Sequence, residues 1–304
     1  MLACHRLTQV MRAAPSPSPR FDLQGHSTVS DGELPPAAVV QAAAASGLEL
    51  FALTDHDSLA GIGEAEAAAA GSGLRLLTGV EMSVLDPAAT DLHVCGYRID
   101  PTDPALLAAL ERSRNDRAAR LARMAQALRQ LGWHVDERPL AQQLTAGLSV
   151  GRPHLAAAVV GDEHNAERLA QERLRNPTEF LVAHLTQGKP AFCERAAPTM
   201  AEVIALIHAA GGLAVWAHPF WDLAGEAEVT TALRRFAAAG LDGVEAFYVT
   251  HTRAQTGLLV SQARALGLIT TGSSDFHGPS HTRFGSFRAF HTFGYEPDLG
   301  PLTG

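Results

Sequence analysis

The stretch Leu50-Phe51-Ala52-Leu53-Thr54-Asp55-His56-Asp57 joins an apolar segment to acidic residues that flank a histidine. Its first four residues are typical of a buried strand. A parallel strand delivers the residues that follow it to the carboxyl-terminal edge of its sheet, where α/β proteins build their active sites. The stretch therefore predicts an α/β fold with polar chemistry at that edge.

Further apolar runs end in the same way. Residues 76–80 lead into Glu81, residues 213–217 into His218, and residues 268–272 into Asp275 and His277. Shorter motifs add His26, Asp31 and His93. Imidazoles and carboxylates that gather at strand ends are the ligands of divalent metals, so the pattern indicates a site for several ions.

The composition favours a compact globular protein. The chain has 304 residues, of which 46% are hydrophobic and 18% charged, enough for one large domain or a barrel with an insertion. No run approaches the roughly 18 apolar residues that a membrane helix needs. Three scattered cysteines agree with a reducing compartment, and we expect a cytoplasmic protein without membrane contact. The net charge of −8 disfavours stable binding of long DNA.

Strand-like runs alternate with helical segments in two parts of the chain. The runs lie near residues 21–23, 48–53, 74–80, 92–97, 213–217, 243–247 and 268–271. Thr199 and Glu202 have the spacing of a capping box that opens a helix over residues 200–210. The alternation predicts an α/β fold with a distorted, seven-stranded (β/α)7 TIM-like barrel of parallel strands and a helical insertion domain.

The change of rhythm after Asp100 sets the predicted boundaries. Residues 1–20 are expected to form a flexible N-terminal extension, residues 21–100 and 194–290 a discontinuous barrel, residues 101–193 a helical insertion or lid, and residues 291–304 a C-terminal tail. Residues 104–131, 152–160 and 166–174 read as helices of the insertion. The segment after Phe284 carries no recognisable chemistry.

Taken in order, the polar motifs resemble those of the PHP (polymerase and histidinol phosphatase) superfamily of metal-dependent phosphoesterases. The resemblance extends from Phe21 to about Gly285, and the nucleotide phosphatase and 5′-3′ exoribonuclease branch is the most similar. The motifs are Asp22-Leu23-Gln24-Gly25-His26-Ser27 with Ser30-Asp31-Gly32, Thr54-Asp55-His56-Asp57, Gly79-Val80-Glu81, His93, Gly151-Arg152-Pro153-His154, Ala217-His218-Pro219 and Ser274-Asp275-Phe276-His277-Gly278.

The resemblance implies two to three divalent ions. It assigns His26, Glu81 and Asp275 to a first ion, Glu81, His93 and His154 to a second, and Asp31, His56 and His277 to a third. Gln24 stands where the family usually has histidine, and its amide oxygen is a poorer donor. The expected alternatives are a weaker first site, a preference for manganese or magnesium over zinc, or occupation only when substrate binds. Manganese is expected first, with zinc, iron and magnesium as alternatives.

The resemblance also implies the reaction. A hydroxide that bridges two ions would attack phosphorus in a small nucleotide of the 3′,5′-bisphosphate type or at the 5′ end of a short RNA. His218 would protonate the leaving group, and Arg152 would bind the phosphate with its planar guanidinium. Lys189 and Arg195 are further candidates for phosphate contact.

Other functions compete with this hypothesis. The alternatives are a histidinol-phosphate phosphatase, a degenerate metal-binding module without activity, and a proofreading partner of a DNA polymerase. Asp57 could orient an imidazole or cap the next helix. The arginines of residues 112–123 could line a nucleic-acid path, but a solvated helix face is the preferred interpretation.

Overall fold

The computed structural model describes residues 19–87 and 89–304, so most of the predicted N-terminal extension lies outside the described residues. Seven strands form one sheet in chain order. They are β1 (Phe21–Asp22), β2 (Leu50–Leu53), β3 (Arg75–Asp86), β4 (Ala89–Tyr97), β5 (Leu213–Trp216), β6 (Gly243–Tyr248) and β7 (Ile269–Ser273). Leu23 N donates to Gly272 O at 3.1 Å, which brings β1 beside β7. The predicted seven-stranded, distorted barrel is confirmed.

One strand departs from the parallel arrangement that we expected. β4 runs antiparallel to both β3 and β5, whereas the remaining neighbours pair in parallel. Only residues 87 and 88 separate β3 from β4. A parallel crossover needs a dozen or more residues. A connection as short as this one permits only a hairpin. The prediction of an all-parallel barrel is wrong at this strand.

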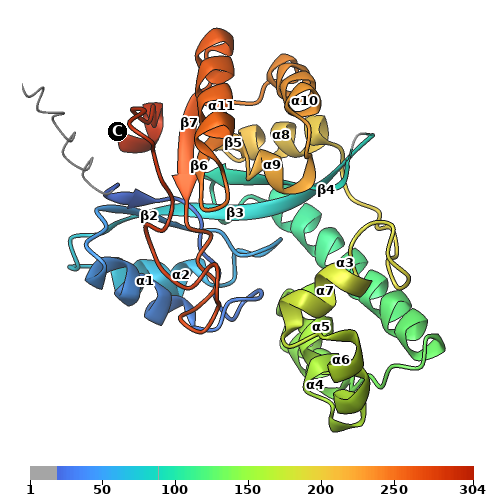
Figure 1. The fold of residues 1–304 in the computed structure, drawn as a ribbon. Helices are drawn as coiled ribbons and strands as arrows, with labels where there is room; N and C mark the ends of the chain where they lie inside the picture. The colour runs from blue at the N-terminus through green and yellow to red at the C-terminus, as the bar shows by residue number, and fades with distance from the viewer. Residues whose placement is uncertain (1–18, 88) are drawn as a thin grey trace, which may run out of the picture.

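Helices cover the outside of the barrel (Figure 1). They are α1 (Pro36–Ala45), α2 (Ile62–Ala69), α8 (Met200–Ala209), the short α9 (Pro219–Asp222), α10 (Glu226–Ala238) and α11 (Arg253–Leu266). α8 begins with the predicted capping box, in which Thr199 N donates to Glu202 Oε2 at 2.7 Å. Proline at the start of α1 is compatible with a first turn that lacks amide partners.

Residues 104–184 form a second group of helices, which begins with the long α3 (Figure 1). These are α3 (Pro104–Gln130), α4 (Arg138–Thr145), α5 (Arg152–Val160), η1 (Glu163–Asn165), α6 (Ala166–Glu172) and α7 (Pro177–His184). They have an apolar cluster of their own that includes Trp133, Leu155 and Phe180. The first turns of α3 differ, because Leu106 and Leu110 belong to the cluster of the barrel. The sequence interpretation did not include α4 and α7.

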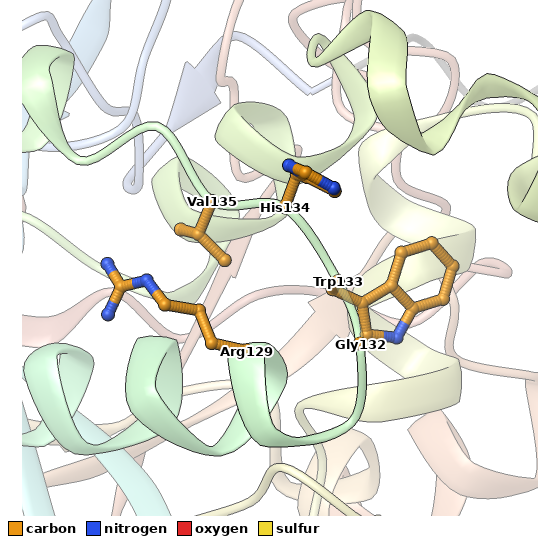
Figure 2. Close-up of a pocket in the computed structure, with 5 residues that line it drawn as sticks. All are labelled: Arg129, Gly132, Trp133, His134 and Val135. Carbon is orange, nitrogen blue, oxygen red and sulfur yellow. The ribbon is translucent and has the colours of Figure 1, made fainter.

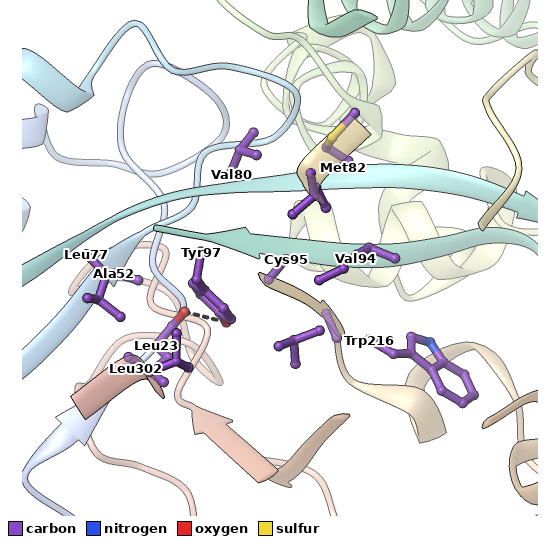
Figure 3. Packing of buried hydrophobic residues seen from close by; sticks show 14 of the residues in the cluster. Leu23, Ala52, Leu77, Val80, Met82, Val94, Cys95, Tyr97, Trp216 and Leu302 are labelled. Atoms are coloured by element: carbon purple, nitrogen blue, oxygen red, sulfur yellow. Dashed lines mark hydrogen bonds between the residues drawn. The ribbon is translucent and has the colours of Figure 1, made fainter. Parts of the chain in front are cut away.

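The barrel core continues into the C-terminal segment (Figure 3). Leu302 is fully buried near Leu23, and Tyr97 donates its hydroxyl hydrogen to Leu23 O at 2.9 Å. Thr270 N, at the start of β7, donates to Asp298 O at 2.7 Å. Residues 298–303, which end in η2 (Gly300–Thr303), therefore close the end of the barrel where the parallel strands begin. Within the described residues, none of the helices is long and apolar enough to cross a membrane.

Candidate metal centre

The loop after β1 is folded by a buried carboxylate that the sequence interpretation did not single out. Asp55 Oδ1 accepts from Ser27 N at 2.8 Å and from the Ser30 hydroxyl at 2.6 Å, and its Oδ2 accepts from the Ser27 hydroxyl at 2.7 Å. A Cβ on Gly32 would lie 2.2 Å from His26 O, so only glycine allows this close turn. The loop thereby fixes His26 and Asp31 beside the end of β2.

Glu81 is the centre of the predicted ligand set. Its carboxylate lies 3.2 Å from His26 Nε2, 3.1 Å from His56 Nδ1, 2.8 Å from His93 Nδ1 and 3.0 Å from His218 Nε2. These imidazoles come from the exits of β1, β2 and β5 and from β4, so they converge from four parts of the barrel. One buried carboxylate thus contacts four imidazoles.

Asp275 and His277 extend the site on the side of β7. Asp275 Oδ1 lies 3.1 Å from His26 Nε2, and Asp275 Oδ2 accepts from the Tyr248 hydroxyl at 2.8 Å. His277 Nε2 lies 3.5 Å from Asp31 Oδ1. Among the described residues, two groups in this site could hold an ion, with all ligand atoms of a group within 4.8 Å of one another. One comprises His26, Asp31, His56 and His277, and the other comprises His56, Glu81 and His93.

The hydrogen bonding of these atoms tests whether a cation fits. Five buried ligand atoms accept or donate no hydrogen bond: His26 Nε2, Asp31 Oδ1, His56 Nδ1, Glu81 Oε2 and Asp275 Oδ1. Buried polar atoms are nearly always hydrogen-bonded, so a cluster of unsatisfied ones needs an explanation. Nitrogen and oxygen donors in this arrangement suit divalent ions. Both polar atoms of the Gln24 amide are also buried and unsatisfied.

The electrostatics of the cluster are set by burial and by mutual attraction. Burial would raise the pKa of Glu81, but the nearby His56 and His93 and the hydrogen bond from His218 hold it well below its ordinary value. Burial would lower the pKa of His218, but Glu81 raises it to about 10. The pKa of His56 falls to about 3, chiefly because it is buried. Metal binding to such a cluster releases the protons that imidazoles carry.

Three of the seven non-glycine residues with positive φ in the described part of the chain lie at the site. Asp57, His218 and Asp275 have φ of 51°, 30° and 53°, in the left-handed region that non-glycine residues rarely adopt. Each follows a strand that contributes to the cluster. Strain of this kind persists where the surrounding structure enforces it, and it concentrates at functional sites.

The insertion reaches the site through the start of α5. Ser149 N donates to Val29 O at 2.9 Å, which joins the segment before α5 to the loop that holds Asp31. Gly151 N donates to His154 Nδ1 at 3.1 Å, and the charge of Asp31 acts on His154. His154 is in neither of the two ligand groups and lies beside Asp31. Arg152, half-buried, is the first residue of the same helix.

Arg112 and Arg123 of α3 are exposed, but the other three arginines between residues 112 and 123 have partners within the protein. Arg117 Nε donates to Asp57 Oδ2 at 2.6 Å and Arg117 Nη2 to the Ser83 hydroxyl at 2.8 Å, while Arg114 donates to Asp57 O at 2.8 Å. Arg120 is buried and donates to Cys193 O at 2.7 Å. The preferred interpretation is therefore wrong for Arg117, which joins the insertion to the barrel, and for Arg120, which is buried against the segment of Cys193. Asp57 is a partner of arginines and not a helix cap.

The two remaining basic candidates lie in different surroundings. Arg195 is 1% exposed and lies 3.8 Å from Asp57 Oδ2 and 3.6 Å from Asp116 Oδ2. Its charge is therefore directed at these two carboxylates, and phosphate contact by Arg195 stays a prediction. Lys189 is exposed in the turn after α7.

A hollow of about 370 Å³ lies in the insertion and contains none of the predicted site residues (Figure 2). It is lined by Arg129, Gly132, Trp133, His134 and Val135. His134 also lies near Asp162 and the exposed His164, in a group whose ligand atoms are within 4.8 Å of one another. Asp162 Oδ1 already pairs with His164 Nδ1 at 2.8 Å, so the closeness of these side chains at the surface does not require an ion.

Three residues near His218 were missed. Glu245 Oε2 accepts from His218 N at 2.8 Å, and burial raises the pKa of Glu245 to about 8. Asp222 Oδ2 lies 3.8 Å from His218 Nδ1, and Tyr248 packs against the His218 ring at 5.3 Å between centroids. Of the three, Glu245 could have been predicted from the sequence, because a charged residue within the apolar run of β6 indicates a buried polar site.

Comparison with known proteins agrees with the fold. The PHP domain family model matches residues 22–209. The chain is 35% identical over 262 residues to a 5′-3′ exoribonuclease of Haemophilus influenzae, covering 86% of this chain and 90% of that protein. It is 34% identical over 283 residues to a 3′,5′-nucleoside bisphosphate phosphatase of Chromobacterium violaceum, covering 93% of each. A crystal structure from Bifidobacterium adolescentis, assigned as a metal-dependent phosphoesterase, has a TM-score of 0.76 at 26% identity and 93% coverage of each chain.

A nearly closed seven-stranded barrel with convergent imidazoles and carboxylates defines a metal-dependent phosphoesterase, a hydrolase of phosphate esters. The chain belongs to the PHP family.

Proposed function

We propose that the protein hydrolyses a phosphate ester of a small nucleotide of the 3′,5′-bisphosphate type, or releases nucleotides from the 5′ end of a short RNA. The observation that carries the proposal is the Glu81 carboxylate within 3.2 Å of four imidazoles, in a cluster where five buried ligand atoms lack hydrogen bonds. The relatives at 35% and 34% identity, which carry these two activities in their names, support the choice of substrate class.

The ligands that we propose for two to three divalent ions are His26, Asp31, His56, Glu81, His93, His154, Asp275 and His277. Gln24 adds a neutral amide that favours manganese over zinc. When bound, such ions polarise a phosphoryl oxygen and lower the pKa of water near neutrality. The contribution of the chain is to hold the ligands in place, as Asp55 does for the loop of His26 and Tyr248 does for Asp275.

Two further side chains act on the substrate in this proposal. Arg152 presents a planar, permanently charged guanidinium at the start of α5, beside the loop of Asp31, and this geometry suits phosphate oxygens. His218 lies against Glu81 and has its amide held by Glu245, so it can deliver a proton to the leaving oxygen. Residues 101–193 act as the lid that selects the leaving group.

The test uses purified protein loaded with manganese. Adenosine 3′,5′-bisphosphate and a short 5′-phosphorylated RNA are incubated separately, and inorganic phosphate or released mononucleotides are measured. Arg152→Met is expected to raise KM, while the same change at the exposed Arg112 of α3 is expected to leave the kinetics unchanged. Silence across a broad panel of phosphate esters would overturn the proposal.

The same preparation separates the rival functions. Histidinol phosphate belongs in the panel, and faster turnover of that ester than of any nucleotide would favour the histidinol-phosphate phosphatase. Metal content is measured in parallel, because less than one ion per chain after incubation with manganese would favour the degenerate module. The cytoplasmic location stays a prediction from the sequence.

A further inference from the structure

An exposed tryptophan lies one helical turn from His218. Trp221 belongs to the short α9 and donates its amide hydrogen to His218 O at 2.8 Å. It is 46% exposed, whereas Trp133 and Trp216 are 2% and 0% exposed. The backbone of Trp221 is therefore fixed beside the proposed metal centre, while nearly half of the residue faces solvent. Burying such a ring against a ligand would remove a large apolar surface from water.

The loop after β7 supports this ring. The Phe284 ring lies 5.8 Å from the Trp221 ring at an interplanar angle of 62°. Phe284 also packs against the proposed ligand His277 at 5.6 Å and against Tyr248 at 6.2 Å between ring centroids. His277 N donates to Phe284 O at 2.9 Å, which fixes the loop. A continuous series of rings therefore leads from the metal centre to Trp221.

Positive charge accompanies the aromatic surface. The guanidinium carbon of Arg283 lies 5.7 Å from the centre of the Trp221 ring. A nucleotide carries an aromatic base and negative phosphates, so an exposed indole next to an arginine matches both parts of it. Stacking on an aromatic ring tolerates any base, since every base has a π face.

We propose that Trp221, supported by Phe284 and Arg283, is the platform on which the substrate base stacks while its phosphate ester lies at the metal centre. This inference rests on the proposed nucleotide substrate and deepens it. Trp221 is the specificity-determining residue that distinguishes a nucleotide from a sugar phosphate without a base.

The first experiment measures selectivity. kcat/KM is determined for adenosine 3′,5′-bisphosphate and for ribose 3,5-bisphosphate, which lacks the base, with the wild type and with Trp221→Ala and Trp221→Phe. Loss of base stacking is expected to lower the preference for the nucleotide roughly ten- to hundredfold in Trp221→Ala. Trp221→Phe keeps most of the preference. Tyr295→Ala, which changes a 37% exposed aromatic residue of the C-terminal segment, is the matched control and leaves the ratio unchanged.

The outcomes separate the two proposals. If the wild type hydrolyses the nucleotide and Trp221→Ala keeps the same selectivity, the platform is wrong and the proposed function stands. If the wild type hydrolyses neither compound, nor any RNA end, both are wrong. Thermal unfolding of each variant confirms that a lost preference does not come from a lost fold.

A second experiment measures binding without turnover. In the wild type, adenosine 5′-phosphate, the product of hydrolysis at the 3′ position, is titrated while tryptophan fluorescence is recorded. Stacking on Trp221 is expected to quench the emission, and the variant Trp221→Phe is expected to lose that quenching, because Trp133 and Trp216 are buried. Equal quenching in both proteins would contradict the platform.

Discussion

The two ends of the barrel are built from the same seven strands, yet the polar atoms at the two ends differ in their hydrogen bonding. At the end closed by the C-terminal segment, Arg75 and Arg98 donate to Thr303 O and Pro301 O, each at 2.7 Å, and Leu302 fills the interior. At the other end, ligand atoms of His26 and Glu81 are buried without hydrogen bonds.

This difference separates stability from function. The closed end satisfies its polar groups and packs its apolar ones, which is what a stable fold requires. The open end, by contrast, holds buried ligand atoms without hydrogen bonds, and such local conflicts are retained where they serve binding or chemistry. Changes at the two ends should therefore have separable effects on activity and on unfolding.

The largest effect is expected at the open end. Glu81→Gln keeps the size of the side chain but removes the charge that contacts four imidazoles. We expect phosphate release to fall by several orders of magnitude and bound metal to decrease, while the circular dichroism spectrum stays that of the wild type. Wild-type turnover in this variant would end the assignment of Glu81 as the central ligand.

The next effect concerns the contact between the open end and the insertion. Arg117→Met leaves the buried Asp57 without its 2.6 Å partner, and breaking a buried ion pair costs about 3–5 kcal/mol. Urea unfolding measures the loss, and Arg112→Met is the exposed control on the same helix. Adding Asp57→Asn to Arg117→Met should recover part of the stability; strictly additive losses would show that the pair is not coupled.

At the closed end the opposite pattern is expected. Leu302→Ala removes a fully buried side chain and should cost about 2–5 kcal/mol of unfolding free energy through the cavity it leaves. Metal content and kcat at 25 °C should be those of the wild type. A loss of bound metal in this variant would break the separation between the two ends.

The smallest effect is a pH dependence. Burial lowers the pKa of His251 from 6.5 to about 4. Between these values the unfolded chain binds a proton that the native protein does not, so acid favours unfolding by up to about 1.4 kcal/mol per pH unit in this window. Above pH 6.5 His251 is neutral in both the folded and the unfolded chain, so its contribution to the free energy of unfolding does not change with pH. His251→Gln should flatten the stability curve between pH 4 and 6.5, and the exposed His291→Gln should not.

Much of the fold was predictable because its signals are local. Apolar runs that end in Asp, Glu or His marked strands and their exits, and the Thr199 and Glu202 spacing marked the start of α8. The convergence of His26, Glu81 and Asp275 follows from the same rule, since the ends of neighbouring strands meet at one edge of the barrel.

What escaped prediction depends on partners distant in the chain. Arg117 and Arg120 look like residues of a solvated helix until Asp57, Ser83 and Cys193 are placed against them. Asp55 and Tyr248 act through hydrogen bonds to loops that no spacing rule connects to them. The antiparallel direction of β4 follows from a connection that is too short for a crossover. The sequence interpretation gave more weight to the expected repeat of strands and helices than to the length of this connection.

The way α3 begins has a consequence for protein engineering. Its first turns supply Leu106 and Leu110 to the barrel core, and its middle supplies Arg117 to Asp57. Residues 101–193 therefore cannot be exchanged between relatives as a self-contained cassette. A chimera that takes a foreign segment must also import matching surfaces on the host, or graft only the portion beyond α3.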